Sequence, residues 1–267
     1  MGMDRRRFLK IAGLGTMMGF GGKAAFELLA PGAVEASLKD LPLTHAKKWG
    51  MVVDMRKMTH EILVACQEAC HLPHNIPDWG DPRVEIKWNW SDTYEHTFPG
   101  MENAYMDEHF LEKDFFVLCN HCDNPPCCRV CPTKATWKRE DGVVMMDLHR
   151  CIGCRFCMAA CPFGARSFNW GDPRKAPPDL NPGFPTNPDY PTRSKGVVEK
   201  CNFCAERIAV GEYPYCVEAA NQLKEGTLIF GDLDDPNSDV REALRSHYTI
   251  RRKAELGTGP NIYYIVS

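Results

Sequence analysis

The sequence predicts an α+β fold made of two small lobes that are held together by metal as much as by apolar packing, with irregular insertions and a C-terminal wrap. Four runs of closely spaced cysteines lie along the 267 residues, and the protein has 14 Cys in all. Apolar segments of strand length precede the runs at 50–54, 115–118, 143–147 and 197–200. Each run is then expected to enter a short helix that bears its last cysteine. The stretch 171–195 carries seven prolines and cannot form a regular helix.

The strongest motif runs from Cys151 to Pro162 with the spacing C-x2-C-x2-C-x3-C-P. In ferredoxins with this spacing, three thiolates hold one [4Fe–4S] cubane and the fourth reaches the neighbouring cluster. The run from Cys119 to Pro132 repeats this cysteine pattern with two extra residues in the loop. Disulfides and zinc are the alternatives, because both also use paired cysteines. Neither calls for a third and a fourth cysteine followed by proline, so the two runs predict cubane clusters.

Two weaker runs flank these motifs. Downstream, Cys201 and Cys204 form a C-x2-C pair that is followed by Cys216. Upstream, Cys66 and Cys70 form C-x3-C-H, which is one residue too long for the usual haem attachment motif C-x-x-C-H. We therefore expect no haem.

An internal repeat shows which ligands have been lost. The segment 145–151 (MMDLHRC) reappears at 52–58 (VVDMRKM), so Met58 stands where a first cysteine would stand. Likewise, Ala220 occupies the position of Cys131 in the parallel between the second and fourth runs. If each run gives three ligands to one cluster and its fourth ligand to the neighbouring cluster, all the missing cysteines belong to a single cluster. The sequence therefore predicts three clusters rather than four.

The remaining cysteines complete three predicted cluster sites when the fourth ligand of each run crosses over. Cluster site 1 comprises Cys70, Cys201, Cys204 and Cys216, cluster site 2 comprises Cys119, Cys122, Cys127 and Cys161, and cluster site 3 comprises Cys131, Cys151, Cys154 and Cys157. Cys66 and Cys128 are left over, and we expect both to pack as buried thiols. His71 and His121 lie beside ligands, but every site is already complete with cysteine, so neither is expected to bind iron.

No catalytic residue is expected. The sequence has no Ser/His/Asp grouping, phosphate-binding loop or nicotinamide fingerprint. Its formal net charge is −3 and no long Lys/Arg run follows the N-terminus, so nucleic acid is not expected as a partner.

The first residues predict export. A basic segment with Arg5, Arg6 and Arg7 is followed by Phe-Leu-Lys, a Gly-rich apolar run over 11–20 and a Val-Glu-Ala cleavage site at 34–36. Twin arginines in this setting are typical of the twin-arginine export signal, and an ordinary basic helix start is the alternative. The apolar run falls short of the roughly 20 residues that span a bilayer. We expect a periplasmic protein or one on the outer face of the cytoplasmic membrane, with the signal either cleaved or kept as an anchor.

The organisation that follows from these motifs has six parts. It comprises a twin-arginine signal peptide (1–36), a first ferredoxin-like lobe with one cluster (48–76 plus 196–232), an insertion with a strand or hairpin arm (77–114), a second ferredoxin-like lobe with two clusters (115–170), a Pro-rich surface arm (171–195) and a C-terminal extension that covers a cluster or faces a partner (233–267).

Over nearly its whole length the sequence resembles the four-cluster iron–sulfur subunits of molybdopterin reductases, polysulfide reductase and some hydrogenases. The resemblance rests on the four ordered cysteine runs, on Gly-Asp-Leu-Asp-Asp-Pro-Asn at 231–237 and on Pro-Asn-Ile-Tyr-Tyr at 260–264. The sequence departs from the family at Met58 and Ala220. The missing cluster is the one that lies nearest the molybdenum subunit in that family, which puts such a partner in doubt.

Within the family, the sequence is most similar to the DsrO-type subunits of DsrMKJOP complexes. This resemblance implies an electron-transfer subunit rather than an enzyme, with an NrfD/PsrC-type integral membrane subunit and an exported multihaem cytochrome c as partners in a sulfur-metabolism complex. The alternative is an iron–sulfur subunit of a molybdopterin or polysulfide reductase or of a periplasmic hydrogenase. A self-contained iron–sulfur enzyme would need a cluster with an open iron, and no such incomplete site is expected.

Overall fold

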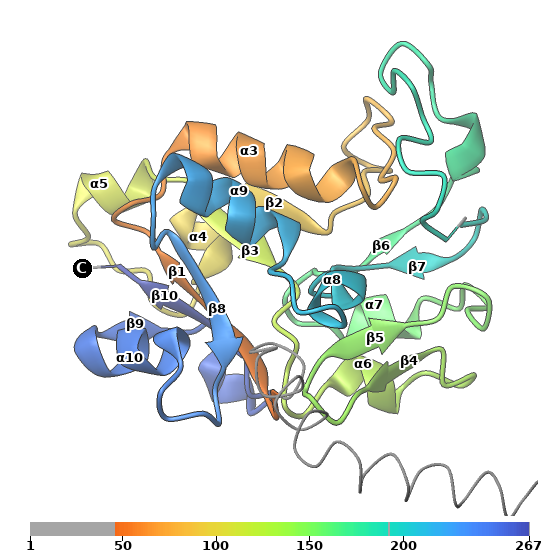
Figure 1. The fold of residues 1–267 in the computed structure, drawn as a ribbon. Coiled ribbons are helices and arrows are strands. Elements are labelled where there is room, and N and C mark those ends of the chain that lie inside the picture. The colour runs from red at the N-terminus through yellow and green to blue at the C-terminus, as the bar shows by residue number, and fades with distance from the viewer. Residues whose placement is uncertain (1–45, 192, 267) are drawn as a thin grey trace, which may run out of the picture. The chain divides into compact units, whose positions relative to one another are not determined.

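The computed structural model describes residues 46–191 and 193–266, and the predicted signal peptide lies outside them. The described residues mix short helices and small sheets, as the α+β prediction requires (Figure 1). The helices are α3 (His60–His71), α4 (Tyr94–Thr97), α5 (Glu108–Leu111), α6 (Pro126–Arg129), α7 (Phe156–Ala160), α8 (Ala205–Ile208), α9 (Tyr215–Leu223) and α10 (Asp239–Ser246), with 3-10 turns η1 (Pro173–Lys175) and η2 (Ala254–Leu256). The strands are β1 (Trp49–Asp54), β2 (Asn89–Asp92), β3 (Phe115–Leu118), β4 (Thr136–Lys138), β5 (Val144–Met146), β6 (Ser167–Phe168), β7 (Val198–Glu199), β8 (Leu228–Asp232), β9 (Thr249–Ile250) and β10 (Ile262–Ile265).

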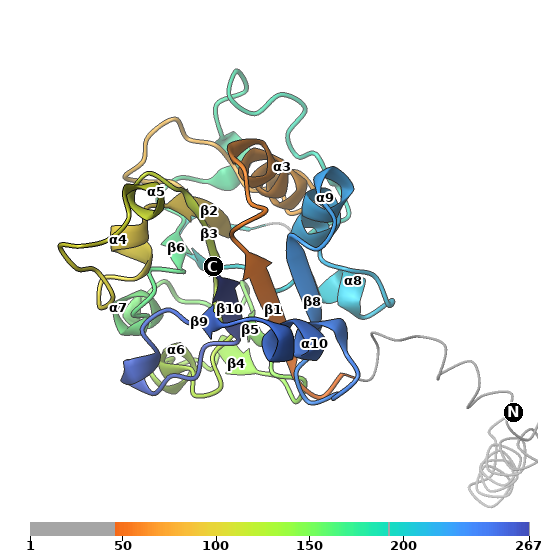
Figure 2. The ribbon, with the colours of Figure 1, turned by 90° about the vertical axis from the view of Figure 1, so that its left-hand side faces the viewer.

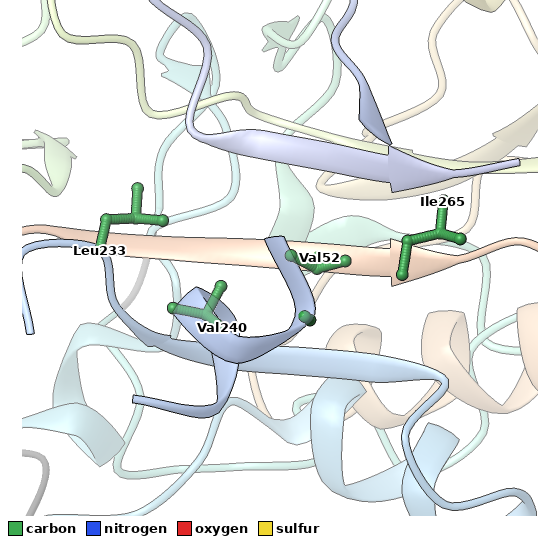
Figure 3. Packing of buried hydrophobic residues seen from close by; sticks show 5 residues of the cluster. Val52, Leu233, Val240 and Ile265 are labelled. Carbon is green, nitrogen blue, oxygen red and sulfur yellow. The ribbon is translucent and has the colours of Figure 1, made fainter. Parts of the chain in front are cut away.

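The largest sheet has the strand order β8-β1-β10-β9. The strand predicted at 50–54 is β1, which pairs antiparallel with β8 and parallel with the C-terminal strand β10. Figure 2 shows these three strands side by side, with the C-terminus at β10. Helix α10 packs on this sheet through Val240 and Ala243, which contact Val52, Leu233 and Ile265 (Figure 3).

The C-terminal extension is therefore more than a wrap, because β10 lies inside the sheet. It also covers part of a predicted cluster site. Lys253 Nζ donates to the carbonyl oxygen of Pro162 at 2.7 Å, and the amide of Asp123 donates to the carbonyl of Gly259 at 2.8 Å. The sequence did not indicate the structural role of β10, and the cluster-covering or partner-facing role of the extension stays a prediction.

The remaining strands form three two-stranded ribbons, β2–β3, β4–β5 and β6–β7. Within the predicted insertion 77–114, the strand is β2, which spans Asn89–Asp92 and pairs with β3. Strand β7, from the predicted first lobe, pairs with β6 of the predicted second lobe. The described residues from Ala46 onward form one compact unit, so the division into two lobes stays a prediction.

The helices after the two strong cysteine runs end one or two residues earlier than predicted. Helix α7 stops at Ala160, so Cys161 caps it with an extended backbone, and α6 stops at Arg129, two residues before Cys131. Both cysteines precede a proline, and a proline disfavours helical backbone in the residue before it. The proline of the motif therefore places the last cysteine just outside its helix.

In the described part of the segment 171–195, namely 171–191 and 193–195, the only regular helix is η1, in keeping with its many prolines. It packs against the residues after α3: Asn187 donates to the carbonyl of Pro73 at 2.9 Å, and Asn181 donates to the carbonyl of Asp78 at 2.7 Å. Among the described residues, no helix is long and apolar enough to cross a membrane.

Candidate iron–sulfur cluster sites

The four cysteines of predicted cluster site 2 line one cavity. Cys119 and Cys122 come from the loop after β3, Cys127 from α6 and Cys161 from the end of α7. The loop turns sharply because His121 has a left-handed backbone with φ of 40°. Burial raises the pKa of Cys122 to about 12, and the neighbouring Cys119 thiolate adds to the rise.

The four cysteines of predicted cluster site 3 line a second cavity, in which Cys131 joins Cys151, Cys154 and Cys157. The loop between the first two thiols of this run needs glycine. Gly153 has φ of +70°, and a Cβ at this position would collide with the carbonyl oxygen of Gly196.

Each of these cavities takes three cysteines from one run and the fourth from the other. Cys131 lies with the thiols of the second run, and Cys161 lies with the thiols of the first. This is the arrangement that the crossing of the fourth ligand requires. Iron binding at the two cavities stays a prediction, but the geometry brings together the residues that the sequence grouped.

The cysteines of predicted cluster site 1 are all buried. Burial raises the pKa of Cys216 well above its ordinary value, and the thiolates of Cys204, Cys66, Cys70 and Cys201 raise it further. Burial likewise raises the pKa of Cys70, with Cys204 and Cys201 as the next causes. The Cys70 thiol, from α3, lies 3.8 Å from Nδ1 of His74, and a ring nitrogen of His74 lies within 4.8 Å of the Cys204 thiol. Cys70 is thus near the fourth run, and its role as a cluster ligand stays a prediction. Cluster assembly here must remove protons from buried thiols.

The Cys66 thiol makes a different contact from the thiol of Cys70, which lies one helical turn further along α3. The Cys66 thiol donates to the carbonyl oxygen of Cys216 at 3.4 Å and is fully buried. Burial is the cause that raises its pKa to about 12. Met58 and Ala220, at the positions where the repeat has lost cysteines, are also buried. The buried Cys66 thiol is as predicted and tethers α3 to α9.

Cys128 is only half-buried, so its prediction as a buried thiol is not met in full. It lies beside Cys127, and a hydrogen bond from Cys128 is the main cause that lowers the pKa of Cys127. The Cys128 thiol also lies 3.9 Å from the hydroxyl of Thr136. Cys128 therefore supports a predicted ligand through a hydrogen bond.

The two central loops meet through a pair of rings at equivalent positions of the repeat. His121, between Cys119 and Cys122, stacks on Phe203, between Cys201 and Cys204, with ring centroids 3.7 Å apart. Both residues have left-handed backbones. Cluster sites 1 and 2 are thus neighbours. Nδ1 of His121 accepts a hydrogen bond of 3.1 Å from the amide of Val144. Burial holds the pKa of His121 well below its ordinary value.

A second histidine contact was not predicted. Nδ1 of His74 lies 2.7 Å from the carbonyl oxygen of Cys70, and its Nε2 lies 2.8 Å from a carboxylate oxygen of Glu206. His74, Glu206 and Cys204 have ligand atoms within 4.8 Å of one another. Since Cys204 belongs to predicted cluster site 1, we assign the histidine and the glutamate to holding the end of α3 against the Cys204 loop.

The chemistry of the sites fits [4Fe–4S] clusters. Two cavities have four thiols each, with no carboxylate or imidazole among their lining residues. Arg166, which lines the cavity of cluster site 2, is buried, and thiolates raise its pKa against the effect of its burial. A buried cation facing thiols suits an anionic thiolate-bound cluster. The fold and the sites thus define an iron–sulfur protein.

Comparison with known proteins also indicates an iron–sulfur protein. A family described as a 4Fe-4S dicluster domain matches residues 113–177. The sequence is 37% identical to the Hdr-like menaquinol oxidoreductase iron-sulfur subunit 1 of Archaeoglobus fulgidus, over 98% of this protein and 97% of the relative. It is 36% identical to the menaquinone reductase iron-sulfur cluster-binding subunit of Nitratidesulfovibrio vulgaris (82% and 88%) and 32% identical to a polysulfide reductase subunit of Wolinella succinogenes (82% and 95%). The protein belongs to this family of iron–sulfur electron-transfer subunits of oxidoreductase complexes, and it is not their catalytic subunit.

Proposed function

We propose that this protein relays electrons through three [4Fe–4S] clusters between a quinone-interacting membrane subunit and a multihaem cytochrome c. The observation that carries the proposal is the pair of cavities lined by four thiols each, with a third buried group of four beside them. Cluster site 2 lies in the middle, because its loops contact cluster site 1 through His121 and its Cys127 packs with Cys157 of cluster site 3. Thiolate-bound cubanes transfer one electron at a time. The protein supplies their ligands, their spacing and their surroundings.

The proposed quinone link draws on the relatives. Two of them, at 36% and 37% identity, carry menaquinone or menaquinol in their names. The membrane partner would be of the NrfD/PsrC type and the acceptor or donor outside the membrane would be the cytochrome, in a complex associated with sulfur metabolism. Co-purification of the complex from its native source, with identification of its haem and membrane subunits, tests this assignment.

The second candidate is the iron–sulfur subunit of a molybdopterin or polysulfide reductase or of a periplasmic hydrogenase. It is favoured by the similarity to the polysulfide reductase subunit of Wolinella succinogenes over 82% of this protein. The lack of cysteine at Met58 and Ala220 disfavours it, because the resemblance places the missing cluster next to a molybdenum subunit. Molybdenum in the purified native complex would decide for this candidate.

The proposed cluster number predicts about twelve iron atoms and as many sulfides per protein, four for each of three clusters. The reason is that three sites have all four thiols, while the fourth has lost most of its ligands. Iron and acid-labile sulfide analysis of the anaerobically purified protein measures this directly. A result near sixteen would show that a fourth cluster is held in spite of Met58 and Ala220.

The proposed export by the twin-arginine route predicts that changing Arg5 and Arg6 together to Lys leaves a cluster-loaded precursor in the cytoplasm. Net charge is unchanged, so the effect tests recognition of the arginine pair by its receptor. Cell fractionation with an immunoblot measures the location, and Arg7→Lys serves as the matched control. Normal export of the double variant would contradict the proposal.

A further inference from the structure

Two buried cations lie among the cluster sites without a carboxylate partner. Lys200 is 2% exposed and Arg166 is 5% exposed. Within 46–191 and 193–266, neither forms an ion pair with a carboxylate, whereas the equally buried Arg193 pairs with Glu199 at 2.6 Å. An unpaired buried charge is strongly unfavourable, so another negative group must face these cations. Arg252 is also buried without a carboxylate, but it lies over the ring of Phe163.

Arg166 reaches the linings of two neighbouring cluster sites. It lines the cavity of cluster site 2. Its guanidinium also lies 3.7 Å from the sulfur of Met146, which lines the cavity of cluster site 3. The guanidinium is held by a hydrogen bond of 2.8 Å to the hydroxyl of Thr136. It therefore lies between cluster sites 2 and 3.

Lys200 lies beside the loop of cluster site 1. Its Nζ donates to the carbonyl oxygens of Val144 and Cys201, the latter at 2.6 Å. Cys201 is a predicted ligand of cluster site 1, and Val144 lines the cavity of cluster site 2. The ammonium group of Lys200 therefore lies between these two sites.

We propose that the buried positive charges of Arg166 and Lys200 raise the reduction potentials of the clusters. Arg166 acts on cluster sites 2 and 3, and Lys200 acts on cluster sites 1 and 2. The inference rests on the three cluster sites of the proposed function. A thiolate-bound cubane is anionic and gains one more negative charge on reduction. A fixed cation in a low-dielectric interior therefore stabilises the reduced form more than the oxidised form. Reduction adds one electron, which a neighbouring cluster or a chemical titrant supplies, and no bond breaks.

The test is a redox titration followed by EPR on the fully loaded protein. Arg166→Gln should lower the potentials at cluster sites 2 and 3 by at least a tenfold change in the reduction equilibrium, or about 59 mV for one electron, and leave cluster site 1 unchanged. Lys200→Gln should lower the potentials at cluster sites 1 and 2 and leave cluster site 3 unchanged. Single Cys→Ser variants at Cys204, Cys122 and Cys154 assign the signals.

Arg150→Gln is the matched control. Arg150 precedes Cys151 as Lys200 precedes Cys201, but its side chain is 68% exposed and lies 3.3 Å from Asp147. Solvent and salt screen such a charge, so we expect less than a twofold change in any reduction equilibrium.

Two charge-conserving variants separate charge from shape. Arg166→Lys and Lys200→Arg should keep both the iron content and the potentials of the parent. If the Gln variants lose clusters while these variants keep them, the requirement for positive charge stands. Equal loss of clusters in the conserving variants, or unchanged potentials in fully loaded Gln variants, would overturn the assignment. Absence of iron from the parent protein would instead refute the cluster sites themselves.

Discussion

Removal of the clusters with an oxidant and a chelator is expected to unfold the residues around cluster sites 2 and 3 while the four-stranded sheet persists. The apolar groups that pack with the cysteines of cluster site 2 are Trp90, Val117, Phe163 and Ala165, and Val144 and three prolines also line its cavity. The ribbons β4–β5 and β6–β7 have three and two residue pairs. Two-stranded ribbons are marginal in water, so most of their stability must come from the metal.

Hydrogen exchange followed by mass spectrometry measures the effect in each segment. We expect amide exchange in β4 to β7 to become at least 100-fold faster, a loss of about 2.8 kcal/mol, and exchange in β1, β8 and β10 to change less than tenfold. The large sheet keeps the apolar core under α10 and the stacked pair Trp49 and Phe230, whose ring centroids lie 4.9 Å apart. Reassembly with iron and sulfide should restore protection. An equal acceleration in both regions would mean that the protein unfolds as one unit.

The cysteine spacing predicted which thiols lie together because it reflects the geometry of a cubane. Cys131 and Cys161 were assigned to the cavities in which the structure places them, across gaps of 20 residues or more in the sequence. The short strands at 50–54 and 115–118 were also predicted within one residue. Local propensity and motif spacing suffice where a feature depends on neighbours in the sequence.

Features that depend on distant pairing were not predictable in the same way. Nothing in the segment 260–264 signals that β10 pairs with β1, because the partner lies some two hundred residues away. The burial of Lys200 was also missed, since a lysine before a cysteine pair is an ordinary exposed residue in most contexts. A buried charge becomes visible only when the fold places the loops of cluster sites 1 and 2 against each other.

The second large effect concerns Cys70, whose assignment to cluster site 1 crosses the longest stretch of sequence. We expect Cys70→Ser to lose that cluster alone, so that iron falls from about twelve to about eight atoms per protein. The Cys70 thiol lies near the fourth run, because it is 3.8 Å from Nδ1 of His74 and a ring nitrogen of His74 lies within 4.8 Å of the Cys204 thiol. Iron analysis and EPR of the reduced variant measure the loss.

Cys66→Ser is the matched control, one turn earlier on the same helix. Residues four apart lie on the same side of a helix but at different heights, so only one of the two thiols can meet a given iron with good geometry. The Cys66 thiol is occupied by the carbonyl of Cys216, and a serine hydroxyl can make the same hydrogen bond. We therefore expect Cys66→Ser to keep about twelve iron atoms. If instead Cys66→Ser loses a cluster and Cys70→Ser keeps all three, the ligand from α3 is Cys66, and the number of clusters can still be three.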